Sequence, residues 1–160
     1  MSKLSSLLVF ITLSIGLSQD VVSAPSSDSN KDADGQVSAP LQLDMLNISE
    51  QRGVLRIAVF DNNNDWLAAT RISKELKVNG ENCSQGRCKW ISEKLPLGEY
   101  AIAVYQDINN NGELDTNFIG LPKEPYGFSN DQAVLISPPS WNKSKFVHKV
   151  HLTKHTITLN

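Results

Sequence analysis

Large aliphatic and polar side chains alternate along much of this chain, and the alternation is clearest in two stretches. In residues 55–60 every second side chain is a large aliphatic one, which predicts a strand with one face against a core. The polar residues 61–65 that follow end this strand in a solvated turn. In residues 100–105 both sets of alternate positions are apolar or aromatic, so we expect a central strand that is covered on both faces.

Shorter stretches with period two or with β-branched residues predict further strands, at residues 41–48, 89–94, 134–136, 146–152 and 156–159. In the first of these the alternation slips between Leu43 and Leu46. Residues 66–78 fit either a short helix capped by Asp65 or an irregular strand. Short strands separated by turn signals predict an all-β fold, an immunoglobulin-like or transthyretin-like Greek-key β-sandwich of about seven strands.

Tyr100 has the position of a tyrosine corner, in which a tyrosine near the start of a strand returns its hydroxyl to the backbone just upstream. Leu95 and Gly98 precede it at the spacing expected for such a corner. We therefore predict that Tyr100 is buried and that its hydroxyl group bonds to main chain within residues 95–97.

The first residues have the pattern of an export signal. Lys3 is the single base there, and an apolar run at residues 7–17 and several small residues follow it. Such a run is too short to cross a bilayer as a permanent helix. We expect a signal peptide over residues 1–18, with cleavage after Ala24 as the alternative, and no permanent membrane span.

Residues 19–40 are expected to form a flexible acidic tether ahead of a β-sandwich domain over residues 41–160. Residues 22–37 hold almost no large apolar side chains, so the segment cannot offset the entropy of ordering itself. Residues 46–160 contain 13 Lys and Arg and 12 Asp and Glu, a net charge of +1, with no basic stripe. This charge pattern predicts no nucleic-acid partner.

The two cysteines, Cys83 and Cys88, are predicted to form a disulfide. A zinc site needs more ligands than two thiolates, and an exported protein meets an oxidising environment. Because the bond closes a loop of only a few residues, we expect it to pin a hairpin tip rather than to determine the fold.

A candidate calcium site follows the central strand. The spacing of five residues matches positions 1, 3, 5, 7 and 9 of an EF-hand loop, with Gly112 at the turn: Asp107, Asn109, Asn111, Glu113 and Asp115. Side chains on alternate residues of a tightly curled loop converge on one point, and Glu113 is expected to contribute its carbonyl oxygen. The acids of this loop repel one another unless a cation intervenes.

The loop departs from the EF-hand pattern at its twelfth position, where Phe118 stands in place of a bidentate glutamate. We therefore expect weak calcium binding, with Glu124 as a candidate substitute ligand. The alternative is a turn that is held only by its own Asx-type hydrogen bonds.

Residues 95–130 resemble the secreted bacterial domain-of-unknown-function 2141 family. The resemblance rests on a Gly-x-Tyr strand at Gly98, the acidic and asparagine-rich loop at residues 107–117, and the segment with Gly120 and its following Pro, Tyr, Gly and Phe. Gln106 stands where relatives often have histidine. The resemblance implies an exported bacterial β-sandwich and implies no particular activity.

Four aromatic residues near the loop form a candidate ligand surface: Phe118, Tyr126, Phe128 and Trp141. They either pack the loop against the sandwich or form a platform for a sugar ring or an apolar partner. The three histidines, at positions 148, 151 and 155, lie in or next to predicted strands and are expected on the surface. The serines lack a nucleophile elbow and the acids fit an ion better than glycosidase chemistry, so we predict that the protein is not an enzyme.

Together these features predict a non-enzymatic, calcium-stabilised β-sandwich that is exported to the periplasm or outside the cell. It would act in the cell envelope as a binding or scaffold module, with an envelope protein or a glycan as its partner. The alternative is a glycan-binding module that uses the aromatic residues beside the loop. A binding module should show a concave, exposed aromatic strip, whereas a scaffold should bury those rings.

Overall fold

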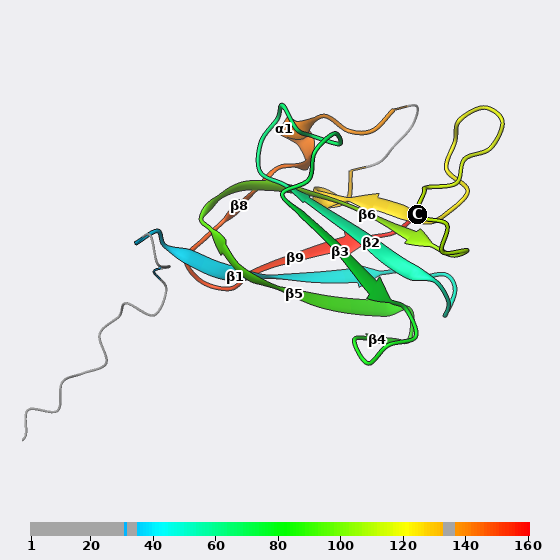
Figure 1. Ribbon diagram of the computed structural model, residues 1–160, viewed down its shortest axis with the longest axis horizontal. Helices are drawn as coiled ribbons and strands as arrows, with labels where there is room; N and C mark the ends of the chain where they lie inside the picture. Colours follow the sequence, from blue (N-terminus) through cyan, green and yellow to red (C-terminus); the bar gives the residue numbers. More distant parts are fainter. Residues whose placement is uncertain (1–30, 32–34, 133–136) are drawn as a thin grey trace, which may run out of the picture.

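A computed structural model of the chain describes residues 31, 35–132 and 137–160 (Figure 1). The predicted signal peptide, most of the predicted tether and the strand predicted at residues 134–136 lie outside these residues. The described part contains nine strands and two short helical segments: β1 Ser38–Leu46, β2 Val54–Phe60, β3 Ile72–Lys77, β4 Cys83–Ser84, β5 Arg87–Pro96, β6 Gly98–Asp107, β7 Tyr126–Phe128, η1 Ser129–Asp131, α1 Trp141–Ser144, β8 Phe146–His148 and β9 Thr153–Thr158.

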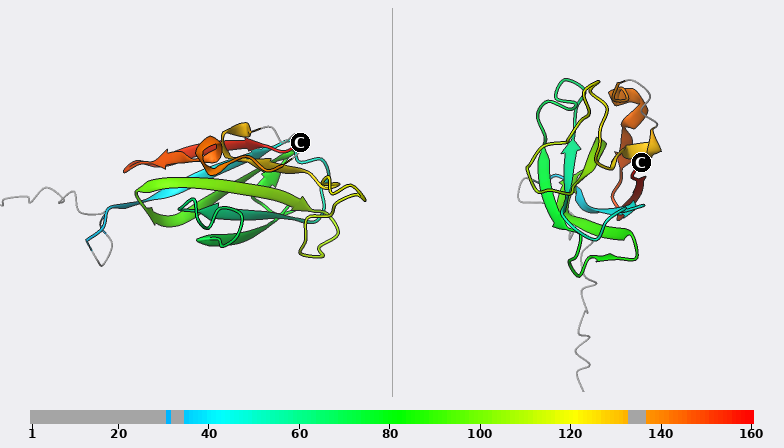
Figure 2. Two further views of the ribbon diagram at one scale, coloured as in Figure 1. Left: turned by 90° about the horizontal axis from the view of Figure 1, so that it is seen from above. Right: turned by 90° about the vertical axis from the view of Figure 1, so that its right-hand side faces the viewer.

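The strands form two sheets that pack face to face, so the prediction of an all-β sandwich is confirmed (Figure 2). One sheet has the order β4-β5-β1-β9, and the other has the order β3-β2-β6-β7 with β8 also paired to β6. Strands β1 and β9 run parallel, and the other paired strands run antiparallel. Figure 1 shows β1 beginning near the end of the sandwich where β8 lies, with the loop after β6 at the opposite end.

The core lies between the sheets and consists of the aliphatic side chains that the alternation placed inward. Strands β1, β2, β6 and β9 supply most of the fully buried ones: Leu41, Leu43, Met45, Leu55, Ile57, Val59, Ile102, Val104 and Ile157. The prediction that both faces of β6 are covered holds at the start of the strand, where Ala101 is buried on the other face beside Phe60 and Trp141. Further along that face Ala103 and Tyr105 are only half-buried.

The start of the first strand differs from the prediction. Strand β1 begins at Ser38, and Ser38 and Ala39 are buried, so residues 38–40 belong to the sheet and not to the tether. The alternation does not slip after Leu43, because Met45 also faces the core. The irregularity in pairing lies earlier, between Pro40 and Gln42.

Three other segments also depart from the predicted elements. Residues 66–69 form a turn, in which the Ala68 and Ala69 amides donate to the Asp65 carbonyl oxygen, and β3 follows it as a strand. Residues 126–128 were expected within a long loop but form β7, which pairs with β6. Of the strand predicted at residues 146–152, only residues 146–148 form a strand, which is β8. Strand β9 begins at residue 153 rather than 156.

The tyrosine corner is confirmed. Tyr100 is 2% exposed and its hydroxyl donates to the Pro96 carbonyl oxygen at 2.9 Å. The prediction that all three histidines lie on the surface was wrong for His148, which is 1% exposed. Its Nε2–H donates to the Ala39 carbonyl oxygen at 2.9 Å, and Nδ1 lies 2.8 Å from the Thr153 hydroxyl. These two polar partners satisfy both ring nitrogens of the buried side chain.

Candidate functional site

The outer face of the β3-β2-β6-β7 sheet carries a groove whose floor is made of small side chains. Register pairs Ser73 with Ala58, Ala58 with Ala103, and Ala103 with Phe128, so one row across the sheet contains three small residues and ends at a ring. Small side chains leave an open space above the sheet, and larger side chains on both sides enclose this space. The space measures about 450 Å³.

Aromatic and charged residues form the sides of this groove. On one side, register places Arg56 beside Tyr105 and Tyr105 beside Tyr126. On the other side lie Phe60 and the loop after β2, with Leu67 at the rim. The groove therefore has a floor of small side chains that is apolar except for the Ser73 hydroxyl, one apolar wall, and a second wall with a guanidinium and two phenol rings.

The polar wall is fixed by an ion pair that reaches into the loop after β6. Arg56 Nε donates to Asp107 Oδ2 at 2.7 Å, and Arg56 Nη1 also contacts the Glu75 carboxylate. The Asp107 side chain is fully buried, whereas 27% of the Arg56 side chain is exposed. Burial alone would raise the pKa of Asp107, but the hydrogen bonds from Arg56 and from the Gly112 and Asn111 amides outweigh it and lower the pKa.

Asp107 also shapes the loop backbone. Its Oδ1 accepts from the Asn111 amide at 3.1 Å and its Oδ2 from the Gly112 amide at 2.9 Å. The Tyr105 hydroxyl donates to the Gly112 carbonyl oxygen at 2.9 Å, which joins the loop to the groove wall. Burial raises the pKa of Tyr105, and the surrounding carboxylates outnumber the single guanidinium that opposes them, so the phenol stays a hydrogen-bond donor.

Glu124 closes the far side of the loop. It is 6% exposed, and its two carboxylate oxygens accept from the Ile108 amide at 2.8 Å and the Asp115 amide at 3.1 Å. The Lys123 amide donates to the Asp115 carbonyl oxygen at 2.7 Å. The side chains of Glu124 and Asp107 therefore both accept hydrogen bonds from backbone amides and hold the loop closed.

The residues predicted as calcium ligands fall into two groups. Asn109 and Asn111 converge on Asp115, with amide nitrogens 2.8 and 3.1 Å from its two carboxylate oxygens. Asp107 is instead engaged by Arg56, and Glu113 lies on the exposed side of the loop. Residues 31, 35–132 and 137–160 contain no group of three or more His, Cys, Asp or Glu side chains arranged to hold a metal ion.

The four predicted surface aromatics do not form one strip. Tyr126 and Phe128 line the groove with ring centroids 6.1 Å apart. Trp141 is buried and packs edge to face on Trp66 at 6.1 Å. Phe118 is 99% exposed at the tip of the loop. Two of the four therefore belong to the groove, one to the core and one to the solvent-exposed tip.

The prediction missed the other residues of the groove, namely Arg56, Ala58, Phe60, Ala103 and Tyr105. Each lies on the outward set of positions in the alternating stretches, so a signal was present in the sequence. That signal assigns a face to a residue but does not align one strand with the next. Only the register of β2 against β6 brings the two alanines side by side.

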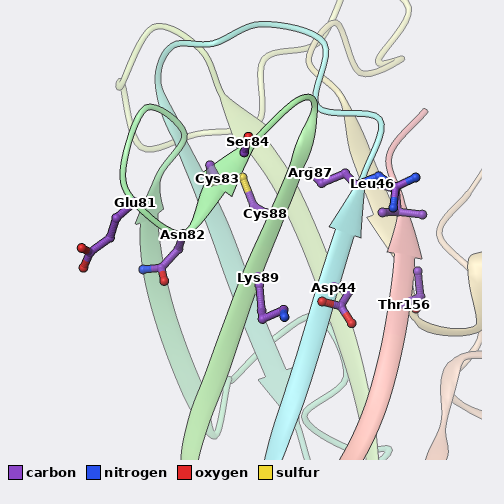
Figure 3. A pocket seen from close by; sticks show the side chains of 10 residues that line it. All are labelled: Asp44, Leu46, Glu81, Asn82, Cys83, Ser84, Arg87, Cys88, Lys89 and Thr156. Carbon is purple, nitrogen blue, oxygen red and sulfur yellow. A yellow bond between two sulfur atoms is a disulfide. The ribbon is translucent and has the colours of Figure 1, made fainter.

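The opposite sheet has a hollow of a different kind, which measures about 490 Å³ and contains the disulfide (Figure 3). Cys83 and Cys88 face each other in register at the end of the β4-β5 hairpin and are bonded, as predicted. The turn residues Gln85 and Gly86 both have positive φ, at 51° and 72°, which is typical of a tight two-residue hairpin. Around the disulfide the lining is polar, with Asp44 and Lys89 adjacent on neighbouring strands.

No helix among the described residues is both long and apolar enough to cross a membrane. Comparison with curated proteins and with solved structures finds no match. A family model does match, over residues 44–156, and its description is an uncharacterized protein conserved in bacteria (DUF2141). This match spans both sheets, the groove and the loop after β6, and it agrees with the resemblance seen in the sequence. The chain belongs to this bacterial family.

Proposed function

We propose that the protein is an exported, non-enzymatic binding module whose ligand lies in the groove on the outer face of the β3-β2-β6-β7 sheet. The observation that carries this proposal is the row of small residues at Ser73, Ala58 and Ala103 between two aromatic walls. A sheet face that only had to meet solvent would not need aromatic walls around a small-residue floor. Concave sites with apolar floors and a few oriented polar groups are typical of ligand binding.

The lining favours a neutral ligand with one apolar face and several hydroxyl groups, which describes a sugar unit. Tyr105 and Tyr126 offer rings for the apolar face. Arg56 and Glu75 at the edge offer donors and acceptors for hydroxyl groups. Because the guanidinium is flanked by Glu75 and Asp107, a ligand of either charge would meet both attraction and repulsion there.

A titration with sugars followed by amide chemical shifts tests this proposal. The probes are chitobiose, maltose and soluble peptidoglycan disaccharides. We expect shifts at Ala58, Ala103 and Tyr126, and their loss in Ala103→Leu, which fills the floor. The control is Ser84→Leu, which places the same side chain at an exposed position on β4 in the opposite sheet, and it should respond like wild type.

Two results would contradict the proposal in different ways. A wild-type protein that responds to none of these sugars removes the glycan as ligand. An Ala103→Leu protein that binds as well as wild type removes the groove as the site. Capture of envelope components with wild type and Ala103→Leu as baits then tests for a protein partner in place of a sugar.

Calcium is proposed as a weak stabiliser of the loop and not as part of the groove. The proximity of Asn109, Asn111 and Asp115 supports it, because a cation could replace the amide nitrogens that now donate to the Asp115 carboxylate. Both amides would have to turn their oxygens towards the ion, since those oxygens now accept from the Asn111 and Glu113 backbone amides. Asp107 does not fit this set, since binding a metal would require it to leave Arg56. The proposed site is therefore smaller than the sequence suggested.

Export is supported by the predicted signal and by the bonded pair Cys83 and Cys88. Disulfides persist in oxidising compartments such as the periplasm or the cell exterior and are rare in reducing ones. Mass measurement of the protein isolated from its host tests the proposal. A mature chain that begins near residue 19 and lacks two thiol hydrogens is expected, and a full-length chain with two free thiols would contradict export.

A further inference from the structure

Two successive residues beside the groove have a backbone conformation that is unfavourable for residues other than glycine. Asn130 and Asp131 belong to η1, which directly follows Phe128, and their φ angles are 64° and 48°. Residues with a side chain keep such angles where the surrounding contacts impose them. Because Phe128 lines the groove and pairs with Ala103 of its floor, the contacts of η1 also fix one side of the groove.

The side chains of both residues bind backbone groups of neighbouring elements. The Asn130 side-chain amide donates to the Lys143 and Lys145 carbonyl oxygens, at 2.9 and 3.0 Å. Asp131 Oδ1 accepts from the Thr158 amide at 2.7 Å. The two residues are therefore held from the end of α1 and from β9.

A further contact, from His155 on β9, needs an imidazole nitrogen without a proton. The Nε2 atom of His155 accepts from the Asn130 backbone amide at 3.0 Å. Since a backbone amide can only donate, Nε2 is unprotonated and the ring proton of the neutral imidazole is on Nδ1. The Phe146 ring stacks on this imidazole with centroids 4.2 Å apart, which limits the directions in which Nε2 can point. Protonation of Nε2 would remove the acceptor and set one N–H group against another.

The surroundings of His155 favour the neutral ring. Strand β1 places an apolar side chain, Leu43, opposite it. The ionisable side chains on the elements around the ring lie on η1, at the end of α1, on β8 and on β9 itself: Asp131, Lys143, Lys145, His148 and Lys154. Burial lowers the pKa of His155, and the attraction of Asp131 for a charged ring opposes this effect without outweighing it.

We propose that His155 is an acid-sensitive contact: its protonation releases the Asn130 amide and loosens Phe128 at the side of the groove. Histidine is the side chain whose charge ordinarily changes between pH 5 and 8. The other bonds of Asn130 and Asp131 remain, so the segment becomes mobile without unfolding the sandwich. Together with the proposed export, this contact would make the shape of the groove respond to external acidity. The inference does not depend on what the groove binds.

Amide hydrogen exchange and the ring ¹⁵N chemical shifts of His155, measured together without any ligand, test the proposal. At neutral pH the shifts should show the tautomer with its proton on Nδ1, and the Asn130 amide should be protected. As the pH is lowered until the ring shifts report protonation, the protection factor of this amide should fall about fivefold, which corresponds to the net contribution of one hydrogen bond. The Phe128 amide shift should move over the same pH range.

Three variants separate this contact from other effects of acid. His155→Gln keeps an acceptor that does not titrate, so the Asn130 amide should stay protected as the pH falls, whereas His155→Leu removes the acceptor and should lower protection at every pH. His151→Gln, which replaces an exposed histidine just before β9, should behave like wild type. Wild-type protection that survives protonation of the His155 ring would overturn the proposal. A fall in protection that persists in His155→Gln would overturn it as well.

Discussion

The two ends of β6 are each closed by one buried polar side chain, but the chemistry differs. At the start, Tyr100 makes a neutral hydrogen bond to Pro96, four residues away in the chain. At the end, Asp107 makes a charged bond to Arg56, 51 residues away. The contribution of a neutral hydrogen bond to stability changes little with pH or salt. The contribution of a buried carboxylate depends on its charged partner, its backbone donors and its own ionisation. The stability of the strand therefore depends more on its last residue than on its first.

Asp107→Ala tests the charged end and should have the largest effect. It leaves the Arg56 guanidinium without its buried partner and removes the acceptor of two loop amides. We expect a loss of about 3 kcal/mol in the free energy of unfolding, measured by urea denaturation without calcium. Asp115→Ala, which removes a more exposed carboxylate of the same loop, should cost less than about 1 kcal/mol. Equal losses in unfolding free energy would show that the buried ion pair stabilises the fold no more than the exposed carboxylate does.

Acid should weaken the charged end and leave the neutral end unaffected. Because the pKa of Asp107 is lowered in the folded state, its contribution is fully present above its unfolded pKa of about 3.9 and is lost as pH falls through the folded value. The difference in unfolding free energy between wild type and Asp107→Asn should therefore shrink from pH 6 towards pH 2. The difference between wild type and Tyr100→Phe should stay constant over that range. The pKa of Asp61 is also lowered, so Asp61→Asn serves as the reference for a more exposed acid.

Tyr100→Phe tests the neutral end. The change keeps the ring against His148 but leaves the Pro96 carbonyl oxygen without its donor, which should cost about 1 to 2 kcal/mol. Tyr105→Phe removes a more exposed hydroxyl bond at the other end of the same strand and should cost about 0.5 kcal/mol. An unchanged unfolding midpoint in Tyr100→Phe would mean that the corner adds nothing to stability.

Calcium should have the smallest effect. With Asp107 held by Arg56, a dissociation constant of about 1 mM gives about 0.4 kcal/mol of stabilisation in 1 mM calcium, seen as a small rise in melting temperature. Asp115→Asn should abolish the rise, whereas Glu113→Gln should keep it, since only the Glu113 carbonyl is proposed to contribute. A wild-type melting temperature that ignores calcium and chelator would leave the loop as a turn held by its own hydrogen bonds.

Local features of the fold were predictable from the sequence, and pairings between distant residues were not. The alternation around residue 57, the Tyr100 corner and the bond between Cys83 and Cys88 each depend on a few neighbouring positions. Strand β7 was missed because three residues with a central glycine carry no periodic signal. The need for glycine at this position is visible only in three dimensions, because a Cβ on Gly127 would lie 2.6 Å from a methyl carbon of Ile157.

The candidate site shows the same division. The loop motif at residue 107 was recognised from its spacing, and calcium in this loop stays a prediction. The cation that the structure supplies to Asp107 is the guanidinium of Arg56, from a strand earlier in the chain. Periodicity had placed Arg56 on the outer face of β2 but could not say which residue of β6 lies beside it.

The parallel pairing of β1 with β9 has a consequence for the order of events during synthesis. The pairing joins Leu41 to Thr153, and β1 is central in its sheet, so that sheet stays incomplete until almost the whole chain is available. Contacts between the two ends of a chain form slowly, because a long loop must close before they contribute. A chain that ends at residue 150 lacks β9, so it should be digested by protease, whereas a chain that includes β9 should resist digestion.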